Sequence, residues 1–206
     1  AASYGVALIE VLTGFKYIGE QIKWFEQNHS HNYVFGLEES YGCLAGTYAR
    51  DKDACVAVMM LCEVASWCKK HGKTLWDAMI DLYEKYGYYR EGLSTMTLKG
   101  IDGAARIQQM MSDMRSNPKK TLGGFEVLAV CDYKEDTRKD LKTGEVTKTG
   151  LPASNVLYYE LSDNAWCCVR PSGTEPKIKF YYGVKGTSLQ DAEKKLEALK
   201  KDLVEE

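Results

Sequence analysis

The hydrophobic pattern of this chain changes near Tyr88–Gly92, and this change constrains the possible folds more than any other feature of the sequence. Before it, apolar residues recur mostly at helical spacing, as they do after Gly14 and after Thr74. After it, short β-prone runs outnumber the helical segments. A chain of 206 residues is long enough for two small domains. We therefore expect one domain over residues 1–89 and a second over residues 90–206.

The first domain is expected to be α/β, with a mixed sheet flanked by helices. Val6–Val11 is apolar and β-prone, and Tyr33–Gly36 is typical of a short buried strand. Ala54–Trp67 is apolar almost all round, which predicts a fully buried helix. Thr74 and Asp77 form a capping box that begins the next helix.

The second domain is expected to be α+β, with an antiparallel sheet and two helices. The helices are predicted over Ile101–Met114 and after Ser188, which is placed to cap the second of them. Ser162–Asn164 indicates a hairpin turn, and the polar stretch Tyr133–Gly150 indicates a mobile loop. The predicted strands are Leu93–Leu98, Phe125–Val130, Asn155–Leu161, Ala165–Val169 and Lys177–Tyr182.

The segment Arg170–Pro176, between two predicted strands, is the strongest candidate for chemistry. A guanidinium binds a phosphate through two parallel hydrogen bonds, and the hydroxyls of Ser172 and Thr174 add donors. Gly173 tolerates positive φ, which lets successive backbone N–H groups point at one anion. The segment therefore predicts an anion site, with a tight turn built on glycine and proline as the alternative.

Gly36–Gly42 is a second candidate, because it places two carboxylates and a hydroxyl between glycines. Glu38, Glu39 and Ser40 suit hydrogen bonding to vicinal sugar hydroxyls. The same residue types also suit a metal site or a solvated turn, and the residues alone leave these alternatives open.

The segment Arg50–Asp53 stands directly before the apolar helix, so Asp51 or Asp53 is a natural N-cap. The helix N-terminus would lower the pKa of Lys52 and make it a better proton shuttle, whereas the neighbouring aspartates would raise that pKa. The sequence does not decide between these effects. Thr13–Lys16 is a strand-to-helix turn that carries little information by itself.

Charge, cysteine content and hydropathy exclude several classes of protein. The 27 Lys+Arg balance 29 Asp+Glu, so the basic excess that nucleic-acid binding needs is missing. Seven cysteines without a Cys-x-x-Cys pair are expected to be reduced thiols, not disulfides or a zinc site. The longest apolar run, Ala54–Cys62, is too short for a membrane span and no signal peptide precedes it, so we expect a cytoplasmic protein without a membrane partner. His29 and His31 stand in a polar turn without nearby carboxylate or cysteine partners, which favours a loop over a metal site.

Taken together and in this order, Thr13–Lys16, Gly36–Gly42, Arg50–Asp53 and Arg170–Pro176 resemble the motifs of the α-D-phosphohexomutases, most closely their bacterial phosphoglucomutase branch. The resemblance extends from Tyr4 to the last predicted helix. Family members have four domains around one cleft. This chain resembles an incomplete domain three, which lacks its first strand, followed by all of domain four.

The resemblance implies roles for individual residues. Glu38 and Ser40 match the pair that grips the sugar hydroxyls, and Lys52 matches the lysine that acts as general acid or base. The other sugar-binding residues that the match implies are Thr13, Gly14, Phe15 and Arg50. The residues that it implies for the non-transferring phosphate are Arg170, Ser172, Gly173 and Thr174, with Lys179 reaching the same group.

The implied activity is the interconversion of glucose 1-phosphate and glucose 6-phosphate through a phosphoserine and a glucose 1,6-bisphosphate intermediate. The family's phosphoserine loop and its three-aspartate Mg²⁺ loop do not occur in this sequence. We therefore expect no metal ligands in this chain and no activity from it alone, with a phosphosugar and the missing N-terminal domains of the same chain as its partners. The alternatives are a phosphomannomutase or phosphopentomutase of the same family, and a stand-alone sugar-phosphate-binding module without catalysis.

Overall fold

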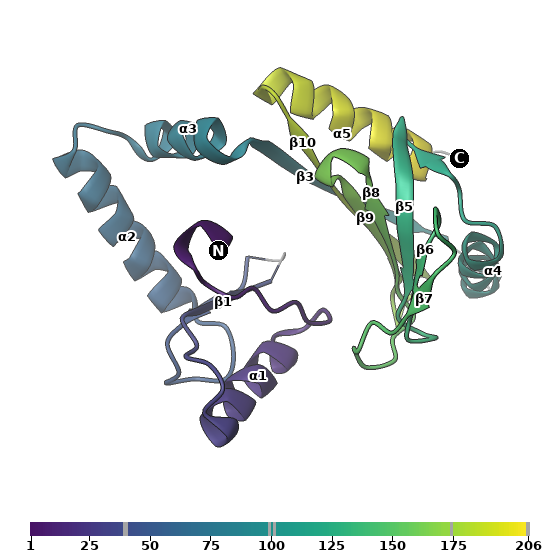
Figure 1. Ribbon diagram of the computed structural model, residues 1–206, viewed down its shortest axis with the longest axis horizontal. Helices are drawn as coiled ribbons and strands as arrows, with labels where there is room; N and C mark the ends of the chain where they lie inside the picture. Colours follow the sequence, from purple (N-terminus) through teal and green to yellow (C-terminus); the bar gives the residue numbers. More distant parts are fainter. Residues whose placement is uncertain (39–40, 99, 101, 174, 205–206) are drawn as a thin grey trace. The chain divides into compact units, whose positions relative to one another are not determined.

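The computed structural model describes residues 1–38, 41–98, 100, 102–173 and 175–204 (Figure 1). The backbone divides into two compact units, Ala1–Ile80 and Asp81–Glu206, and the division falls inside helix α3 (Leu75–Tyr86). Strand β3 (Tyr88–Thr97) belongs to the second unit and begins five residues earlier than the predicted strand. The second unit therefore includes the end of α3 as well as β3.

The first unit combines helices with one small hairpin of strands. Its elements after the 3-10 turn Ala2–Tyr4 are α1 (Phe15–Asn28), β1 (Phe35–Leu37), β2 (Cys43–Ala45), α2 (Ala54–Lys70) and the first part of α3. Strands β1 and β2 pair antiparallel, with Gly36 opposite Leu44. The core cluster of this unit comes from α1 and β2, and it consists of Phe15, Ile18, Ile22 and Leu44.

The caps predicted for α2 and α3 are confirmed. Asp53 is the N-cap of α2, where its Oδ1 accepts hydrogen bonds from the Cys55 N–H at 2.7 Å and the Val56 N–H at 3.3 Å. At α3 the Asp77 N–H donates to Thr74 Oγ1 at 3.1 Å, and the Thr74 N–H donates to Asp77 Oδ2 at 2.8 Å. This is the reciprocal pattern of a capping box.

Three predictions for the first unit are wrong. Val6–Val11 forms no strand, and the strand predicted over Tyr33–Gly36 is not buried, since Val34 is 63% and Phe35 44% exposed. Only Cys68 of α2 is buried, although the apolar pattern predicts burial all round. The shared reason is that β1–β2 is the only sheet among the described residues of this unit. A two-stranded hairpin is too small to cover the apolar faces of these segments.

The second unit is built on one antiparallel sheet. Its helices are α4 (Gly103–Ser116) and α5 (Leu189–Val204). Its strands after β3 are β4 (Thr121–Leu122), β5 (Phe125–Asp132), β6 (Thr137–Asp140), β7 (Val146–Thr147), β8 (Leu157–Leu161), β9 (Trp166–Pro171) and β10 (Lys177–Gly186). The strand order is β3-β10-β9-β8-β5-β6-β7, and β4 pairs with β5.

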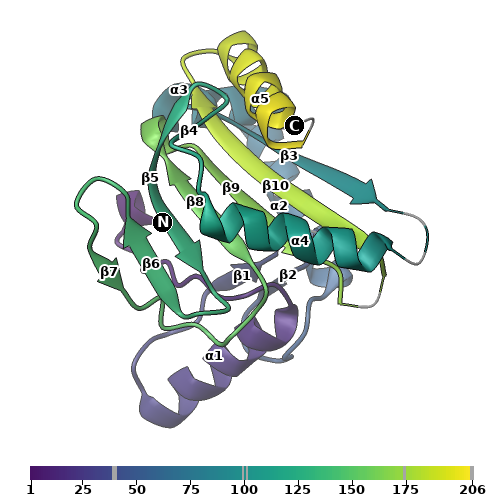
Figure 2. The same cartoon turned by 90° about the vertical axis from the view of Figure 1, so that its right-hand side faces the viewer.

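Helices α4 and α5 cover the same face of this sheet (Figure 2). Alternate side chains of β10, which include Ile178 and Phe180, are fully buried in the core beneath the helices. The backbone at Gly123 packs so closely against α5 that only glycine fits, since a Cβ there would lie 2.5 Å from the Leu199 Cα. The Gly123 N–H also donates to Asp202 Oδ2 of α5 at 2.7 Å. Helix α5 is thus fixed beside strands β4 and β5 by both packing and a hydrogen bond.

The stretch Tyr133–Gly150 is not the mobile loop that its polarity predicts. Strand β6 pairs with both β5 and β7. The carboxylate of Asp136 accepts hydrogen bonds from the N–H and hydroxyl of Thr149, at 3.1 and 2.8 Å. Arg138 of β6 forms an ion pair with Glu160 of β8. These local partners satisfy the polar side chains, so a charged sequence forms strands here.

Two further predictions for the second unit are confirmed. The Asp191 N–H donates to Ser188 Oγ at 3.1 Å, so Ser188 caps α5 as its position predicts. The turn between β8 and β9 is Ser162–Asn164, where Asp163 and Asn164 both have a φ of 57°. The mixed α/β first part and the α+β second part agree with the predicted fold class.

Candidate functional site

Three separate segments of the first unit meet at the side chain of Lys52. Its Nζ lies 3.2 Å from Asp51 Oδ1 and 3.7 Å from Glu38 Oε1. The same Nζ lies 5.8 Å from the centroid of the Phe15 ring. Phe15 begins α1, Glu38 follows β1, and Lys52 precedes α2. The three candidate segments of the first unit therefore converge on one ammonium group.

Backbone hydrogen bonds connect the two loops that carry these side chains. The Glu38 N–H donates to the Gly42 carbonyl at 2.9 Å, which closes the loop between β1 and β2. The Asp53 N–H donates to the Cys43 carbonyl, also at 2.9 Å, which ties the segment before α2 to strand β2. The main chain itself therefore brings Glu38 and Lys52 together.

The charge of Lys52 is stabilised by its neighbours. A hydrogen bond to Asp51, reinforced by that carboxylate's charge and more weakly by Glu38, raises the pKa of Lys52 above its ordinary value. The backbone N–H and the ammonium of Lys52 in turn lower the pKa of Asp51. From the sequence, the helix N-terminus could lower this pKa or the neighbouring aspartates could raise it. In the structure the effect of Asp51 is the larger, and the pKa is raised. Lys52 therefore keeps its proton at neutral pH.

Tyr48 also contacts the segment before α2, although no sequence motif identifies this tyrosine. Its hydroxyl donates to Asp53 Oδ2 at 2.5 Å. This hydrogen bond raises the pKa of Tyr48 to about 12 and lowers the pKa of Asp53. Asp53 consequently holds both the tyrosine and the first turn of α2.

The guanidinium of Arg50 is bound to other groups than Glu38. Its Nη2 lies 2.6 Å from Glu26 Oε2, and its Nη1 donates to the Thr47 carbonyl at 2.6 Å. Its backbone lies against α1, because a Cβ on Gly19 would be 2.5 Å from the Arg50 carbonyl oxygen. Arg50 thus anchors its loop to α1 in this structure.

Thr13 and Gly14 form the entry to α1. Gly14 has a φ of 124°, which favours glycine, and its carbonyl accepts a hydrogen bond from the Tyr17 N–H at 3.0 Å. Thr13 is exposed beside it. Ser40 lies outside the described residues. The predicted sugar-side residues that the structure brings together are Phe15, Glu38 and Lys52.

The loop between β9 and β10 is closed by Ser172. Its N–H donates to the Lys177 carbonyl at 2.8 Å, and its Oγ accepts from the Glu175 N–H at 3.3 Å. Gly173 does not adopt the predicted positive φ, because these bonds of Ser172 already turn the chain. A Cβ on Gly173 would meet no atom within 4 Å, so the loop is open on that side. Thr174 lies outside the described residues.

Arg170 and Lys179 lie directly opposite each other in strands β9 and β10. Thr95 of β3 lies opposite Lys179 on its other side, so the three side chains share one face of the sheet. The Nε of Arg170 is buried and has no hydrogen-bond partner among the described residues. A buried donor without a partner is uncommon in proteins, so this Nε is available to a bound anion. The sequence did not single out Thr95, because only the register of β3 places it in this row.

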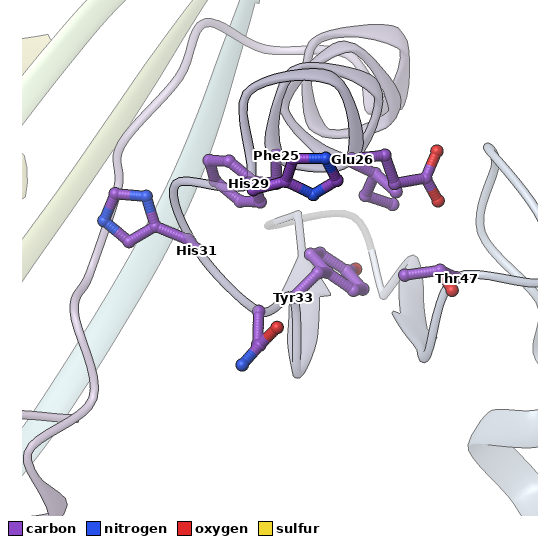
Figure 3. Close-up of a pocket in the computed structure, with 8 residues that line it drawn as sticks. Phe25, Glu26, His29, His31, Tyr33 and Thr47 are labelled. Atoms are coloured by element: carbon purple, nitrogen blue, oxygen red, sulfur yellow. The ribbon is translucent and has the colours of Figure 1, made fainter.

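A separate pocket of about 490 Å³ lies at the end of α1 (Figure 3). Figure 3 shows Phe25 and Glu26 on the helix above Tyr33 and Thr47. The residues that line it are Ile22, Phe25, Glu26, His29, His31, Asn32, Tyr33 and Thr47. They include neither Glu38 nor Lys52, so this pocket is not the predicted site. In the described part of the chain, no group of three or more His, Cys, Asp or Glu side chains is placed to hold a metal ion.

Comparison with known proteins gives one consistent result. Residues 1–86 match the family described as phosphoglucomutase/phosphomannomutase, alpha/beta/alpha domain III. The chain is 38% identical over 190 residues to the phosphoglucomutase of Staphylococcus aureus strain bovine RF122 / ET3-1, and 37% identical to that of strain MRSA252. Each alignment covers 92% of this chain and 34% of the relative. The chain thus spans about a third of the length of these relatives. Within the described residues, no helix has the length and hydropathy needed to cross a bilayer.

Proposed function

We propose that this chain is the sugar- and phosphate-binding part of a phosphoglucomutase, a member of the phosphoglucomutase/phosphomannomutase family whose domain III its residues 1–86 match. The whole protein would interconvert glucose 1-phosphate and glucose 6-phosphate through a phosphoserine and a bisphosphate intermediate. The observation that carries this proposal is the convergence of Phe15, Glu38 and Lys52, from three separate segments, on one ammonium group. The resemblance assigns these three residues to one sugar-binding site, and their contacts agree with that assignment.

The first unit would bind the sugar. The side chain of Glu38 is only 14% exposed, so its carboxylate can accept hydrogen bonds from sugar hydroxyls in a partly desolvated place. Ser40 would bind the same hydroxyls, with Thr13, Gly14, Phe15 and Arg50 around them. Lys52 is protonated at neutral pH, and its raised pKa disfavours release of the proton. Its ammonium would therefore donate a hydrogen bond to a substrate oxygen and stabilise the negative charge there. Phosphoryl transfer depends mostly on positioning and charge stabilisation, and both are within reach of these residues.

The second unit would bind the phosphate that is not transferred. Arg170 and Lys179 supply two cations on one face of the sheet. The buried Nε–H of Arg170 could donate a hydrogen bond to a phosphate oxygen. Ser172, Gly173 and Thr174 would add hydroxyl and backbone N–H donors to the same phosphate. Inert phosphate and sugar would thus be held by different units. This arrangement allows the sugar to bind in two orientations without a close-fitting wall.

We propose that the rest of the same protein supplies the nucleophile and the metal. The described residues of this chain include no group of side chains that fits a Mg²⁺ ion, so the ion would be held by residues outside them. Helix α2 supports a missing partner, because it exposes a contiguous apolar face that includes Val58, Leu61 and Trp67. The curated relatives are about three times as long as this chain, which leaves ample sequence to cover that face. A cytoplasmic location fits both the substrate class and the free cysteines.

The direct test measures binding and turnover on the 206-residue chain. We expect saturable binding of glucose 6-phosphate by calorimetry and no mutase turnover above background. Turnover by the chain alone would contradict the proposed division of the protein. Binding of neither glucose 6-phosphate nor glucose 1,6-bisphosphate would contradict the binding role.

Two alternative functions can be tested by comparing ligands and by assaying a longer form of the protein. A preference for mannose 6-phosphate or ribose 5-phosphate over glucose 6-phosphate would identify a mutase for another sugar. If the longest natural form of the protein also lacks turnover, the chain is a binding module without catalysis.

A further inference from the structure

We propose that Asp51 and Gly42 are positioning residues that hold the ammonium of Lys52 beside Glu38. The inference rests on the proposed function, because it takes Lys52 and Glu38 as the pair that faces the sugar phosphate. Neither Asp51 nor Gly42 is assigned such a role by the family resemblance. Both are identified by contacts in the structure.

Asp51 holds Lys52 from one side. A single oxygen, Asp51 Oδ1, accepts the Lys52 backbone N–H at 2.8 Å and the Lys52 ammonium at 3.2 Å. These two bonds fold the lysine side chain back over its own backbone. A lysine with four rotatable side-chain bonds would otherwise sample many positions in solvent, since its side chain is 49% exposed. Asp51 therefore selects one direction for the ammonium.

Gly42 provides the space into which Lys52 folds. Gly42 is buried, and a Cβ there would lie 2.6 Å from Lys52 Cδ and 2.7 Å from Glu38 Oε1. Both distances are shorter than a Cβ tolerates, so both the lysine and the glutamate side chains would have to move. The backbone of Gly42 does not have positive φ, so alanine is compatible with its conformation. The glycine is therefore needed for contact, not for the turn.

Together the two residues leave the ammonium partly free. Lys52 has three N–H donors, and the two carboxylates of Asp51 and Glu38 approach it at 3.2 and 3.7 Å. The remaining donor can reach a substrate oxygen while Glu38 accepts from a neighbouring hydroxyl. A lysine released from Asp51 would keep its charge but lose this fixed direction.

The test measures the affinity of the full chain for glucose 6-phosphate by calorimetry, for Asp51→Asn in the native and Lys52→Ala backgrounds. We expect Asp51→Asn to weaken binding about three- to tenfold in the native background, since it removes a charge-assisted contact to the binding lysine. The loss should vanish in the Lys52→Ala background, because only coupled residues show such non-additivity. Asp51→Glu should restore part of the affinity. Glu63→Gln is the matched control, since it removes one exposed carboxylate of the same unit.

A second readout separates positioning from a merely structural role. The pKa of Lys52, followed by NMR of its labelled ε-carbon, should fall toward the ordinary lysine value in Asp51→Asn and stay unchanged in Glu63→Gln. Gly42→Ala should weaken glucose 6-phosphate binding about tenfold or more while leaving inorganic phosphate binding unchanged, since small misplacements of a binding group are costly. Circular dichroism would show whether Gly42→Ala remains folded, and Asp51, which is 75% exposed, tests the inference independently.

The outcomes distinguish this inference from the proposed function. If Lys52→Ala itself leaves glucose 6-phosphate binding unchanged, the proposed role of Lys52 is wrong. If Lys52→Ala weakens binding but Asp51→Asn costs the same in both backgrounds, or leaves the pKa of Lys52 unchanged, the positioning role of Asp51 is overturned. If Gly42→Ala folds and binds glucose 6-phosphate like the native chain, the role of Gly42 is overturned.

Discussion

The two units of this chain differ in how they hold their candidate residues. The second unit fixes Arg170 and Lys179 on adjacent strands of a sheet whose other face is a large core under α4 and α5. The first unit has a core cluster of four residues, and it holds Glu38 and Lys52 through a few loop hydrogen bonds. The phosphate-side cations are therefore positioned by the core, whereas the sugar-side pair is positioned by local contacts.

This difference has a consequence for stability and for binding. A site built on a packed sheet keeps its geometry for as long as the core stays folded. A site built on loops can be altered by single surface residues without unfolding the unit. The predictions below test this contrast, beginning with the largest expected effect.

The core of the second unit should be the most sensitive part of the chain. Phe180 is fully buried in β10, so Phe180→Ala should lower the free energy of unfolding of this unit by about 3–5 kcal/mol. Denaturant unfolding followed by circular dichroism would measure it. Leu93→Ala is the control, because Leu93 is 54% exposed and should cost less than about 0.5 kcal/mol. Similar losses for both variants would contradict a core-built second unit.

The same contrast explains what the sequence could predict. In the second unit, alternation and caps identified the main strands and both helices, because their apolar faces find partners within the unit. The polar hairpin β6–β7 was missed, since its order depends on contacts such as Arg138 with Glu160 that no local pattern reveals. In the first unit, the apolar run Val6–Val11 predicted a strand and Ala54–Trp67 predicted a fully buried helix, but the described residues of this unit offer no larger sheet for either segment to join or pack against.

The candidate site shows the same limit at the level of residues. The sequence marked Glu38 and Lys52 by their segments, but it could not show that they meet over Phe15. Asp51 and Gly42 were visible only as a possible cap and a loop glycine. Their relation to Lys52 depends on the path of two loops, which is set by one backbone hydrogen bond within the β1–β2 loop and one from Asp53 to Cys43 of β2.

Removal of Arg170 should produce the largest loss of binding. Arg170→Ala is expected to weaken glucose 6-phosphate binding by about 2 kcal/mol or more, because a charge-assisted contact to phosphate disappears. Calorimetry should show a comparable loss for inorganic phosphate. The control is Arg106→Ala, an exposed arginine of α4 outside the proposed site. An unchanged affinity in Arg170→Ala would show that Arg170 is structural and that the phosphate lies elsewhere.

Glu38→Gln should separate the two units by ligand. It replaces a carboxylate acceptor by a weaker neutral one, so glucose 6-phosphate binding should weaken by about 1.5 kcal/mol. Inorganic phosphate binding should not change, since no sugar is present to contact the first unit. Glu63→Gln, on the exposed side of α2, controls for the lost charge. Equal losses for both ligands would contradict the proposed division between a sugar-binding and a phosphate-binding unit.

The smallest expected effect is a dependence of the first unit on acid pH through Asp53. Its pKa is lowered by the Tyr48 hydroxyl and by the Cys55 and Val56 N–H groups, so its carboxylate stabilises the folded state above the unfolded pKa near 3.8. That contribution is lost as the pH falls through the lowered pKa of the folded state. The thermal midpoint should therefore drop in this acid range.

Asparagine caps a helix about as well as aspartate but does not titrate. Asp53→Asn should thus keep the cap but lower the midpoint at pH 7 slightly, because the charge of the carboxylate is lost, and it should flatten the decline of the midpoint in acid. Asp191→Asn is the matched variant in the second unit, where the pKa of Asp191 is lowered by the Thr187 N–H and by Lys195. If Asp53→Asn declines in acid as steeply as the native chain while Asp191→Asn does not, α2 does not depend on its cap. The first unit would then be held by contacts other than the loop hydrogen bonds that bring Glu38 to Lys52.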